Sequence, residues 1–371
     1  MKSLRRAGLV LGVAWAALAS VMTSPVEAVP RYSARYNQKC SLCHVNPSGG
    51  GLRTLYASQD LVPKEIAWSD PKPEVLKGID PLIAKSIVIG TDFRTLHAYS
   101  DQRANSTDFF QMQGDIYLAF LMGEKTELYY DRGMSSTSEL FGLAYVLPVT
   151  GGYVKVGRFV PSYGWRFDDH TMFVRNDLGF APPGNRDVGV ELGASPGHLD
   201  LQVDFTNGNR GALLGGDSKY ATALNSSYRF RVLQAGMAVG VSGYREPTES
   251  ETFKVGGVHG YVSWEPVTWV GEADVFRSVW TGGGGPTGVV SSNEFSVVLH
   301  RGLEVLGTFD FYDPDRRIES GAKTRWGGGV HLMPNPFLTV EALYRRSTFK
   351  NGPALSGNDF YQTILQAHFL Y

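Results

Sequence analysis

The chain has 371 residues, with 35 Lys plus Arg against 36 Asp plus Glu, so its formal net charge is −1. This balance argues against a nucleic-acid-binding protein, which normally carries a basic surplus. Only 19% of the residues are charged, whereas 44 glycines and 12% aromatic residues are typical of strands and turns. Two cysteines are too few for a disulfide framework, which leaves one disulfide, a redox dithiol or a haem anchor.

Residues 1–28 are predicted to form a secretory signal peptide. Lys2, Arg5 and Arg6 make a positive start, residues 7–22 are apolar, and residues 26–28 offer a small-residue cleavage site. An uncleaved anchor is the alternative, but the apolar run is short for a membrane-spanning helix. We therefore expect export to or beyond the periplasm. No later stretch reaches the roughly 18 apolar residues of a spanning helix.

Both cysteines belong to the stretch Cys40-Ser41-Leu42-Cys43-His44. The pattern C-x-x-C-H is the attachment sequence of c-type haem, in which two thiols bond to the porphyrin and the histidine is the proximal iron ligand. A thiol–disulfide protein is the alternative, but such dithiols occur in βαβ settings that this sequence lacks. The following glycines, residues 49–51, allow either a close approach of backbone to porphyrin or simply a flexible loop.

Residues 29–83 are predicted to be a small monohaem c-type cytochrome segment. It contains a helical candidate at residues 52–59, and the prolines after it indicate an irregular connector: Pro63, Pro71, Pro73 and Pro81. A segment of this size has a marginal core of its own. We therefore expect it to pack its haem against the rest of the chain, where it is suited to plug a lumen.

From residue 84 to residue 371 the apolar pattern has a period of two, which predicts antiparallel strands. The clearest alternating stretches are residues 110–122, 141–147, 188–194, 199–205, 233–241, 303–311, 338–344 and 361–371. Short and long connections alternate between them, as in outer-membrane barrels. The sequence thus predicts an all-β fold, an antiparallel transmembrane β-barrel of about sixteen strands. A soluble β-sandwich is the alternative, but the apolar faces are long and free of charge.

The second axial ligand of the haem iron is sought among barrel histidines. His300, His331 and His368 fall on the polar faces of predicted strands twelve, fourteen and sixteen, near their periplasmic ends. Our hypothesis is that one of them, with His331 or His368 preferred, ligates or neighbours the haem. The alternative is that a polar lumen contains histidines in any case.

The long connection over residues 160–187 is rich in aromatic residues and is predicted to fold into the lumen. Its Asp168, Asp169 and His170 offer a cation site, because carboxylates and imidazole suit iron; a solvated loop surface is the alternative. No nucleophile triad, phosphate-binding loop or pair of catalytic carboxylates stands out in the sequence.

In this combination the chain resembles the fused outer-membrane cytochrome–porins, best known from iron-oxidising bacteria. The resemblance covers the whole mature chain in architecture, and Cys40, Cys43 and His44 match the family's haem-binding positions. It implies one covalent haem c, an outer-membrane location and electron transfer between an external donor or acceptor and a periplasmic c-type cytochrome. In the iron-oxidising members the donor is ferrous iron, so Fe(II) oxidase activity is one candidate. The alternatives are a small-solute porin with a haem sensor or gate, and a sheath for a separate multihaem cytochrome.

Overall fold

The computed structural model describes residues 30–69, 71–72, 74, 80–102, 106–134, 138–181, 186–208, 219–318, 320–351 and 357–371. The predicted signal peptide lies outside the described residues, as do Pro73 and residues 209–218. Within the described part of the chain, no helix is long and apolar enough to cross a membrane.

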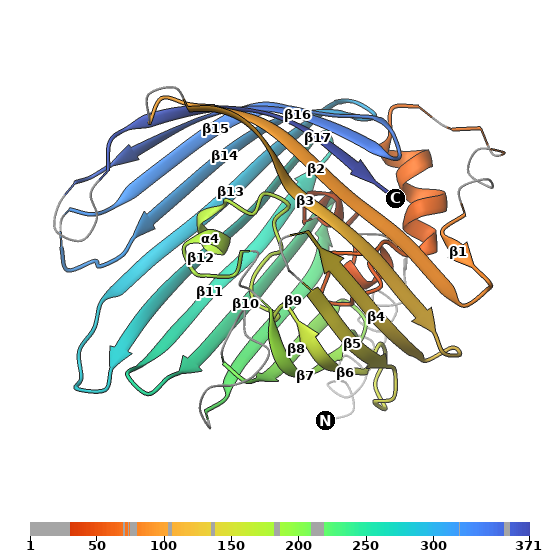
Figure 1. Cartoon of the computed structure of the whole chain (residues 1–371), viewed down its shortest axis with the longest axis horizontal. Helices are drawn as coiled ribbons and strands as arrows, with labels where there is room; N and C mark the ends of the chain where they lie inside the picture. Colours follow the sequence, from red (N-terminus) through yellow and green to blue (C-terminus); the bar gives the residue numbers. More distant parts are fainter. Residues whose placement is uncertain are drawn as a thin grey trace, which may run out of the picture.

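Sixteen antiparallel strands, β2 to β17, form a closed barrel (Figure 1), which confirms the predicted fold class. Each strand pairs with the next along the chain, and β17 pairs with β2, so that Leu370 lies opposite Asp92 and the sheet has no free edge. The strands are β2 (Ile87–Ser100), β3 (Ser106–Leu121), β4 (Thr126–Gly133), β5 (Ser138–Ala144), β6 (Tyr153–Phe159), β7 (Asp187–Ala194), β8 (Leu199–Thr206), β9 (Ala221–Val232), β10 (Ala235–Pro247), β11 (Glu251–Trp264), β12 (Val267–Trp280), β13 (Thr287–His300), β14 (Leu303–Asp313), β15 (Lys323–Asn335), β16 (Leu338–Phe349) and β17 (Phe360–Leu370).

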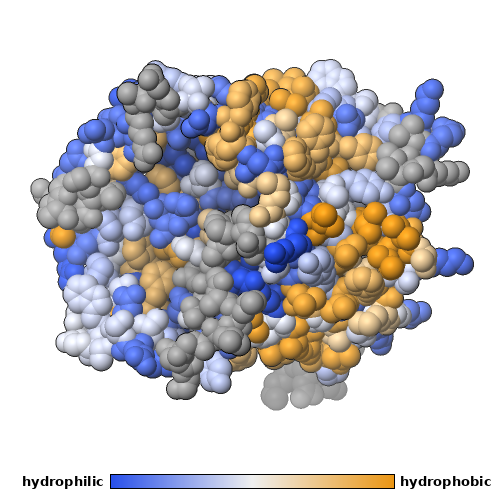
Figure 2. Space-filling view, in the orientation of Figure 1, coloured by the Kyte–Doolittle hydropathy of each residue, from blue (hydrophilic) through white to orange (hydrophobic). Residues whose placement is uncertain are grey.

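The connections alternate between tight turns at one end of the barrel and longer loops at the other, as the sequence predicts. The turn between β13 and β14 spans only Arg301 and Gly302, whereas residues 160–186 separate β6 from β7. Figure 2 shows one side of the barrel in the orientation of Figure 1. Apolar side chains are concentrated on the half with the tight turns, and hydrophilic ones lie toward the longer loops.

The alternation along the strands separates an apolar outer surface from a polar lumen. On β14, Val305 and Phe309 are exposed on the outside, while Glu304 and Asp310 are buried inside. This is the arrangement that a hydrocarbon exterior requires.

Strand β5 differs, because its larger apolar side chains face inward. Phe141 and Leu143 are buried in a cluster with Tyr129 of β4 and with Leu52 of the N-terminal segment. The alternation predicted for residues 141–147 is confirmed as far as Ala144, where β5 ends, and its apolar face covers the N-terminal segment instead of the barrel exterior.

The N-terminal segment consists of α2 (Pro30–Tyr36), the 3-10 turn η1 (Cys40–Leu42) and the π-helix η2 (Ala57–Ile66). Figure 1 shows its first part within the barrel and its orange helix at the tight-turn end, beside the C-terminus. Helix α2 packs against β10, β11 and β12. Buried Arg31 pairs with Glu294 at 3.3 Å and with Glu304 at 3.5 Å. A short strand, β1 (Leu82–Ile83), pairs with the start of β2 and leads into the barrel.

The predicted helix at residues 52–59 is displaced toward the C-terminus. Arg53 instead forms a β-bridge with His44, and Leu52 packs on the lumen wall. The helix extends through Pro63 to Ile66, so this proline does not begin the irregular connector. The wide π-type turn, in which Ala67 N–H donates to Val62 O at 2.9 Å, places Leu61, Val62 and Ile66 in one apolar cluster with Cys43.

Candidate functional site

The C-x-x-C-H stretch forms a compact turn. The backbone N–H groups of Cys43 and His44 both donate to Cys40 O, at 3.2 and 3.0 Å. The two thiols have different surroundings: Cys43 packs in an apolar cluster with Ala57 and Met333, whereas Cys40 borders a cavity with Arg166 and His259. The two cysteines are unbonded, and Cys43 is buried. Burial raises the pKa of the Cys40 thiol to about 11, whereas reactive redox dithiols have a lowered pKa.

The His44 ring is oriented by the loop that follows it. Its Nδ1 lies 3.3 Å from Gly51 O, so a proton on Nδ1 is donated there and Nε2 keeps the lone pair. Metal-binding histidines commonly use their second nitrogen in this way, which fixes the tautomer and the ring orientation. The geometry therefore suits an axial ligand.

Glycines 49–51 all have positive φ angles, so they are needed for the loop conformation itself. A Cβ on Gly51 would overlap the phenol oxygen of Tyr129, and the same phenol accepts from the Leu52 N–H at 3.3 Å. The triplet is thus a left-handed turn packed against β4.

Lys155 of β6 joins this loop to the barrel wall. Its ammonium, on a side chain with no exposed surface, donates to Asn46 Oδ1 at 3.2 Å and Ser48 Oγ at 2.9 Å. It also pairs with the equally buried Glu191 at 2.7 Å. Arg166 adds a bond from the other side, donating to Gly49 O at 2.5 Å.

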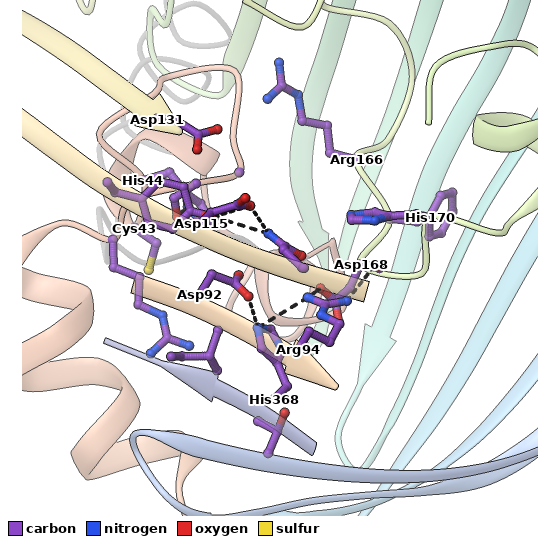
Figure 3. A pocket seen from close by; sticks show the side chains of 18 of the residues that line it. Cys43, His44, Asp92, Arg94, Asp115, Asp131, Arg166, Asp168, His170 and His368 are labelled. Atoms are coloured by element: carbon purple, nitrogen blue, oxygen red, sulfur yellow. Dashed lines mark hydrogen bonds and ion pairs between the residues drawn. The ribbon is translucent and has the colours of Figure 1, made fainter. Parts of the chain in front are cut away.

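A cavity of about 260 Å³ lies in the lumen between the N-terminal segment and the barrel wall. Cys43 and His44 line it, as do His331, Met333 and His368 from β15 and β17. Figure 3 shows His44 and Cys43 on one side of this pocket, and Arg94 with His368 below them. Cys40 opens onto a smaller neighbouring cavity with Arg166 and His259. Side chains of both charges line the cavity. They include Arg31, Arg53, Arg94, Arg166, Arg186, Asp92, Asp115 and Asp168.

Two of the three candidate histidines line the cavity, and the third does not. His331 and His368 are buried in the lumen and line the cavity with His44. His300 does not line it: this residue ends β13 after a bulge, is exposed, and stacks on Trp68 with ring centroids 4.5 Å apart. The bulge between Val298 and His300 shifts the alternation, which is why the expected inward position of His300 is wrong.

The loop between β6 and β7 fills the lumen, as the sequence predicts. Its aromatic side chains are buried, and a short helix, α4 (Phe173–Asn176), packs against β13. The Tyr163 hydroxyl donates to Asp274 at 2.7 Å, and the Trp165 N–H donates to Glu272 at 2.6 Å. The loop is therefore bonded to the wall along its length. Residues 182–185, including Pro182, Pro183 and Gly184, lie outside the described part.

Asp168 and Asp169 are neither a cation site nor a solvated surface, because arginines bind both of them. Asp168 pairs with Arg94 at 2.9 Å, and Asp169 pairs with Arg345. Burial opposes ionisation of Asp169, but Arg345 outweighs it and lowers the pKa of this carboxyl to about 2. Burial lowers the pKa of His170 to about 4. Among the described residues, no group of three or more His, Cys, Asp or Glu is placed to hold a metal ion.

Several residues of the site could not be located from the motif. Met333 packs in the cluster that contains Cys43, and Tyr129 supports Gly51, although both are far away in sequence. For Lys155 the alternation gives a weak indication of its position. It lies between Val154 and Val156, so the pattern places it on the lumen face of its strand. Its partners Asn46 and Ser48 depend on the long-range fold.

The comparisons with known proteins show the fold. No protein-family model matches the chain, and no curated protein matches it. The anion-selective porin from Comamonas acidovorans superimposes with a TM-score of 0.58 at 9% identity, over 77% of this chain and 99% of that one. OmpT, an outer membrane protein of Vibrio cholerae, gives 0.58 at 8% identity, over 77% and 99%. OprB of Pseudomonas putida gives 0.57 at 9% identity, over 83% and 99%. The chain therefore has the fold of the outer-membrane porins.

Proposed function

We propose that the protein is an outer-membrane monohaem c-type cytochrome whose barrel holds its own haem segment in the lumen and which transfers electrons across the membrane. The observation that carries the proposal is the position of the C-x-x-C-H turn. Cys43 and His44 face a lumen cavity that is also lined by buried barrel histidines. A redox group bound in this cavity would lie inside the lumen, surrounded by the barrel wall.

The residues present fit a haem c. Cys40 and Cys43 would hold it through thioether bonds, and His44 would bind its iron. Ala57, Val62 and Ile66 supply an apolar wall, and the lining arginines provide cationic partners for its propionates. When bound, the group would accept and release one electron at a time.

The chain's own residues shield and position this site. Helix α2 and the loop over residues 160–181 fill the lumen on two sides of the cavity. Both segments would keep bulk water away from a haem bound there. The apolar band of such a barrel is about 25 Å tall, so a haem at the periplasmic surface would be remote from an external partner. A lumen position shortens that distance.

The two ends of the barrel suit different partners. The N-terminal segment lies at the tight-turn end, where Lys39 donates to Ser195 O at 2.6 Å and Trp68 N–H to Met333 O at 2.8 Å. Tight turns face the periplasm in outer-membrane barrels, so a periplasmic c-type cytochrome would meet this end. The external donor or acceptor, with iron as one candidate, would meet the loop end, and outer-membrane lipid would surround the wall.

A second candidate function is a small-solute porin with the haem segment as sensor or gate, because the structural neighbours are porins. A sheath around a separate multihaem cytochrome is less well supported, since the chain's own segments already occupy the lumen. The two remaining functions differ in what they conduct: electrons or solutes.

Haem attachment is tested by expressing the full chain in a host with a c-type cytochrome maturation system. Purified protein is denatured, and covalent haem is measured by in-gel peroxidase stain and by mass spectrometry. We expect one haem in the wild type and none in the Cys40→Ala/Cys43→Ala double variant, with His300→Ala unchanged as the matched control. A wild-type barrel that assembles without covalent haem would contradict the proposal.

A further inference from the structure

We infer that His331 of β15 is the second axial ligand of the haem iron, opposite His44. This inference rests on the proposed function and adds to it the residue that completes the iron coordination. Three observations support it: β15 lies next to the C-x-x-C-H turn, the His331 ring is buried with one nitrogen unpaired among the described residues, and the other histidines make different contacts.

The inner face of β15 lies beside the haem-binding turn. Met333 is 2% exposed and packs in the apolar cluster that includes Cys43. His331 lies two residues before it and is also buried, at 4% exposed. His331 lines the same cavity as Cys43 and His44, so a haem attached at that turn and bound in this cavity would have the His331 ring in its wall.

The His331 ring is buried, and one of its two nitrogens has no hydrogen-bond partner in the described part of the chain. The residue is 4% exposed, and its Nδ1 has no hydrogen-bond partner among the described residues. Leaving a buried polar atom unsatisfied costs about 1–3 kcal/mol. Such a cost points to a ligand that the ring is positioned to bind.

The neighbouring strands provide the support that an iron-binding imidazole needs. The strand register places Glu304 of β14 and Glu341 of β16 directly opposite His331. One ring nitrogen can therefore donate to a carboxylate while the other binds the iron, an arrangement that orients a metal-binding histidine and raises its basicity.

The other histidines on this side of the lumen have different contacts. His368 Nε2 lies 2.7 Å from Asp92 and 3.4 Å from Arg94, which itself pairs with Asp168. His368 thus belongs to a formed charge network, which suits a position beside the haem rather than on its iron. His300 stacks on Trp68 outside the cavity. Met333 is enclosed by the apolar cluster around Cys43.

The first measurement uses the purified wild-type holoprotein and no variant. Magnetic circular dichroism and electron paramagnetic resonance of the ferric form distinguish bis-histidine from histidine–methionine ligation. We expect the bis-histidine, low-spin signature. A histidine–methionine signature or a high-spin wild type would overturn the assignment of His331.

The second measurement compares His331→Ala with His368→Ala. We expect His331→Ala to become high-spin and to recover the low-spin spectrum when imidazole is added, while His368→Ala stays low-spin without it. A low-spin His331→Ala protein would overturn the assignment. If His331→Ala does not assemble, His368→Ala decides, because loss of its bis-histidine signature would assign the ligand to His368 instead.

These outcomes are separate from a failure of the proposed function. If the denatured wild type contains no covalent haem, the cytochrome proposal fails as a whole. If it contains haem and His331→Ala keeps the wild-type spectrum, only the ligand assignment fails.

Discussion

Gly51 lies where a side chain would overlap the phenol of Tyr129, and its φ of +71° is in the left-handed region. Both features belong to the loop that orients His44, whose Nδ1 lies 3.3 Å from Gly51 O. The position of this one backbone carbonyl is thus tied to a side-chain contact across the lumen. Gly51 therefore couples the shape of the loop to the direction of the His44 ring.

Gly51→Ala should reduce the yield of haem-loaded protein. The left-handed backbone alone costs a residue with a Cβ about 1–2 kcal/mol, and the overlap with Tyr129 must also be relieved by moving the loop. The matched control is Gly123→Ala, which has a φ of +87° but nothing within 4 Å of the added Cβ. The ratio of haem absorbance to protein distinguishes the two. Equal loading in both variants would show that the Tyr129 contact is unimportant.

Lys155→Met should destabilise the folded protein by about 3–5 kcal/mol, because it leaves the buried Glu191 carboxylate without its cation. It also removes the bonds to Asn46 and Ser48, so the loop that follows the C-x-x-C-H turn is no longer bonded to Lys155 of β6. Urea unfolding of protein in detergent or lipid measures the change. Lys254→Met, at an exposed position of β11, should stay near the wild type. A midpoint equal to that control would contradict the role of Lys155.

At the level of elements, the connection over residues 160–186 is attached to the barrel wall by ion pairs spaced along it. Arg94 pairs with Asp168, Arg345 with Asp169, and Lys323 with Asp177 at 2.6 Å. The first two are largely buried arginines, so truncating them leaves carboxylates without partners in the lumen. Those pairs keep the loop across the pore.

An Arg94→Met/Arg345→Met variant should conduct ions better than the wild type in planar bilayers. Without its two guanidinium partners, the loop is held less firmly near Asp168 and Asp169, and we expect the pore beside these residues to widen. Arg277→Met, at an exposed position on β12, serves as the control and should conduct like the wild type. Unchanged conductance in the double variant would show that these ion pairs do not hold the loop.

Acidification should open the same loop in two ranges of pH. The pKa of His170 is lowered from 6.5 to about 4, so docking of the neutral ring is favoured above 6.5 and is weakened as the pH falls to about 4. The pKa of Asp169 is lowered from 3.8 to about 2, so its pairing is lost only as the pH falls between those values. Ion conductance recorded from pH 7 to pH 3 should rise; a flat profile would contradict this account.

The strands could be predicted from the sequence because alternation is local, whereas the exceptions have long-range causes. On β14 the lipid-facing and lumen-facing sets follow directly from residues 303–311. On β5 the apolar residues Phe141 and Leu143 face inward because the N-terminal segment covers them. The displaced helix η2 has the same origin, since Leu52 is used for packing on the wall. Sequence patterns do not encode which partner a face will meet.

Across the whole molecule, the lumen is filled by two segments of the same chain. The N-terminal segment enters the lumen from the tight-turn end, and the loop over residues 160–181 folds into the lumen from the wall between β6 and β7. Their meeting place, where Arg166 donates to Gly49 O, borders the C-x-x-C-H turn. The haem motif and the barrel were predictable separately, but their contact surface was not. It depends on residues such as Lys155 and Met333, which the fold brings to residues 40–51.

Electron transfer through liposomes tests the central claim most directly. Wild-type holoprotein is reconstituted in vesicles that enclose a soluble c-type cytochrome, and a membrane-impermeant reductant is added outside. We predict reduction of the enclosed cytochrome by the wild type, and none by the Cys40→Ala/Cys43→Ala variant in matched vesicles. If the wild type leaves the enclosed cytochrome oxidised while passing small solutes, the protein is a porin and not an electron conduit.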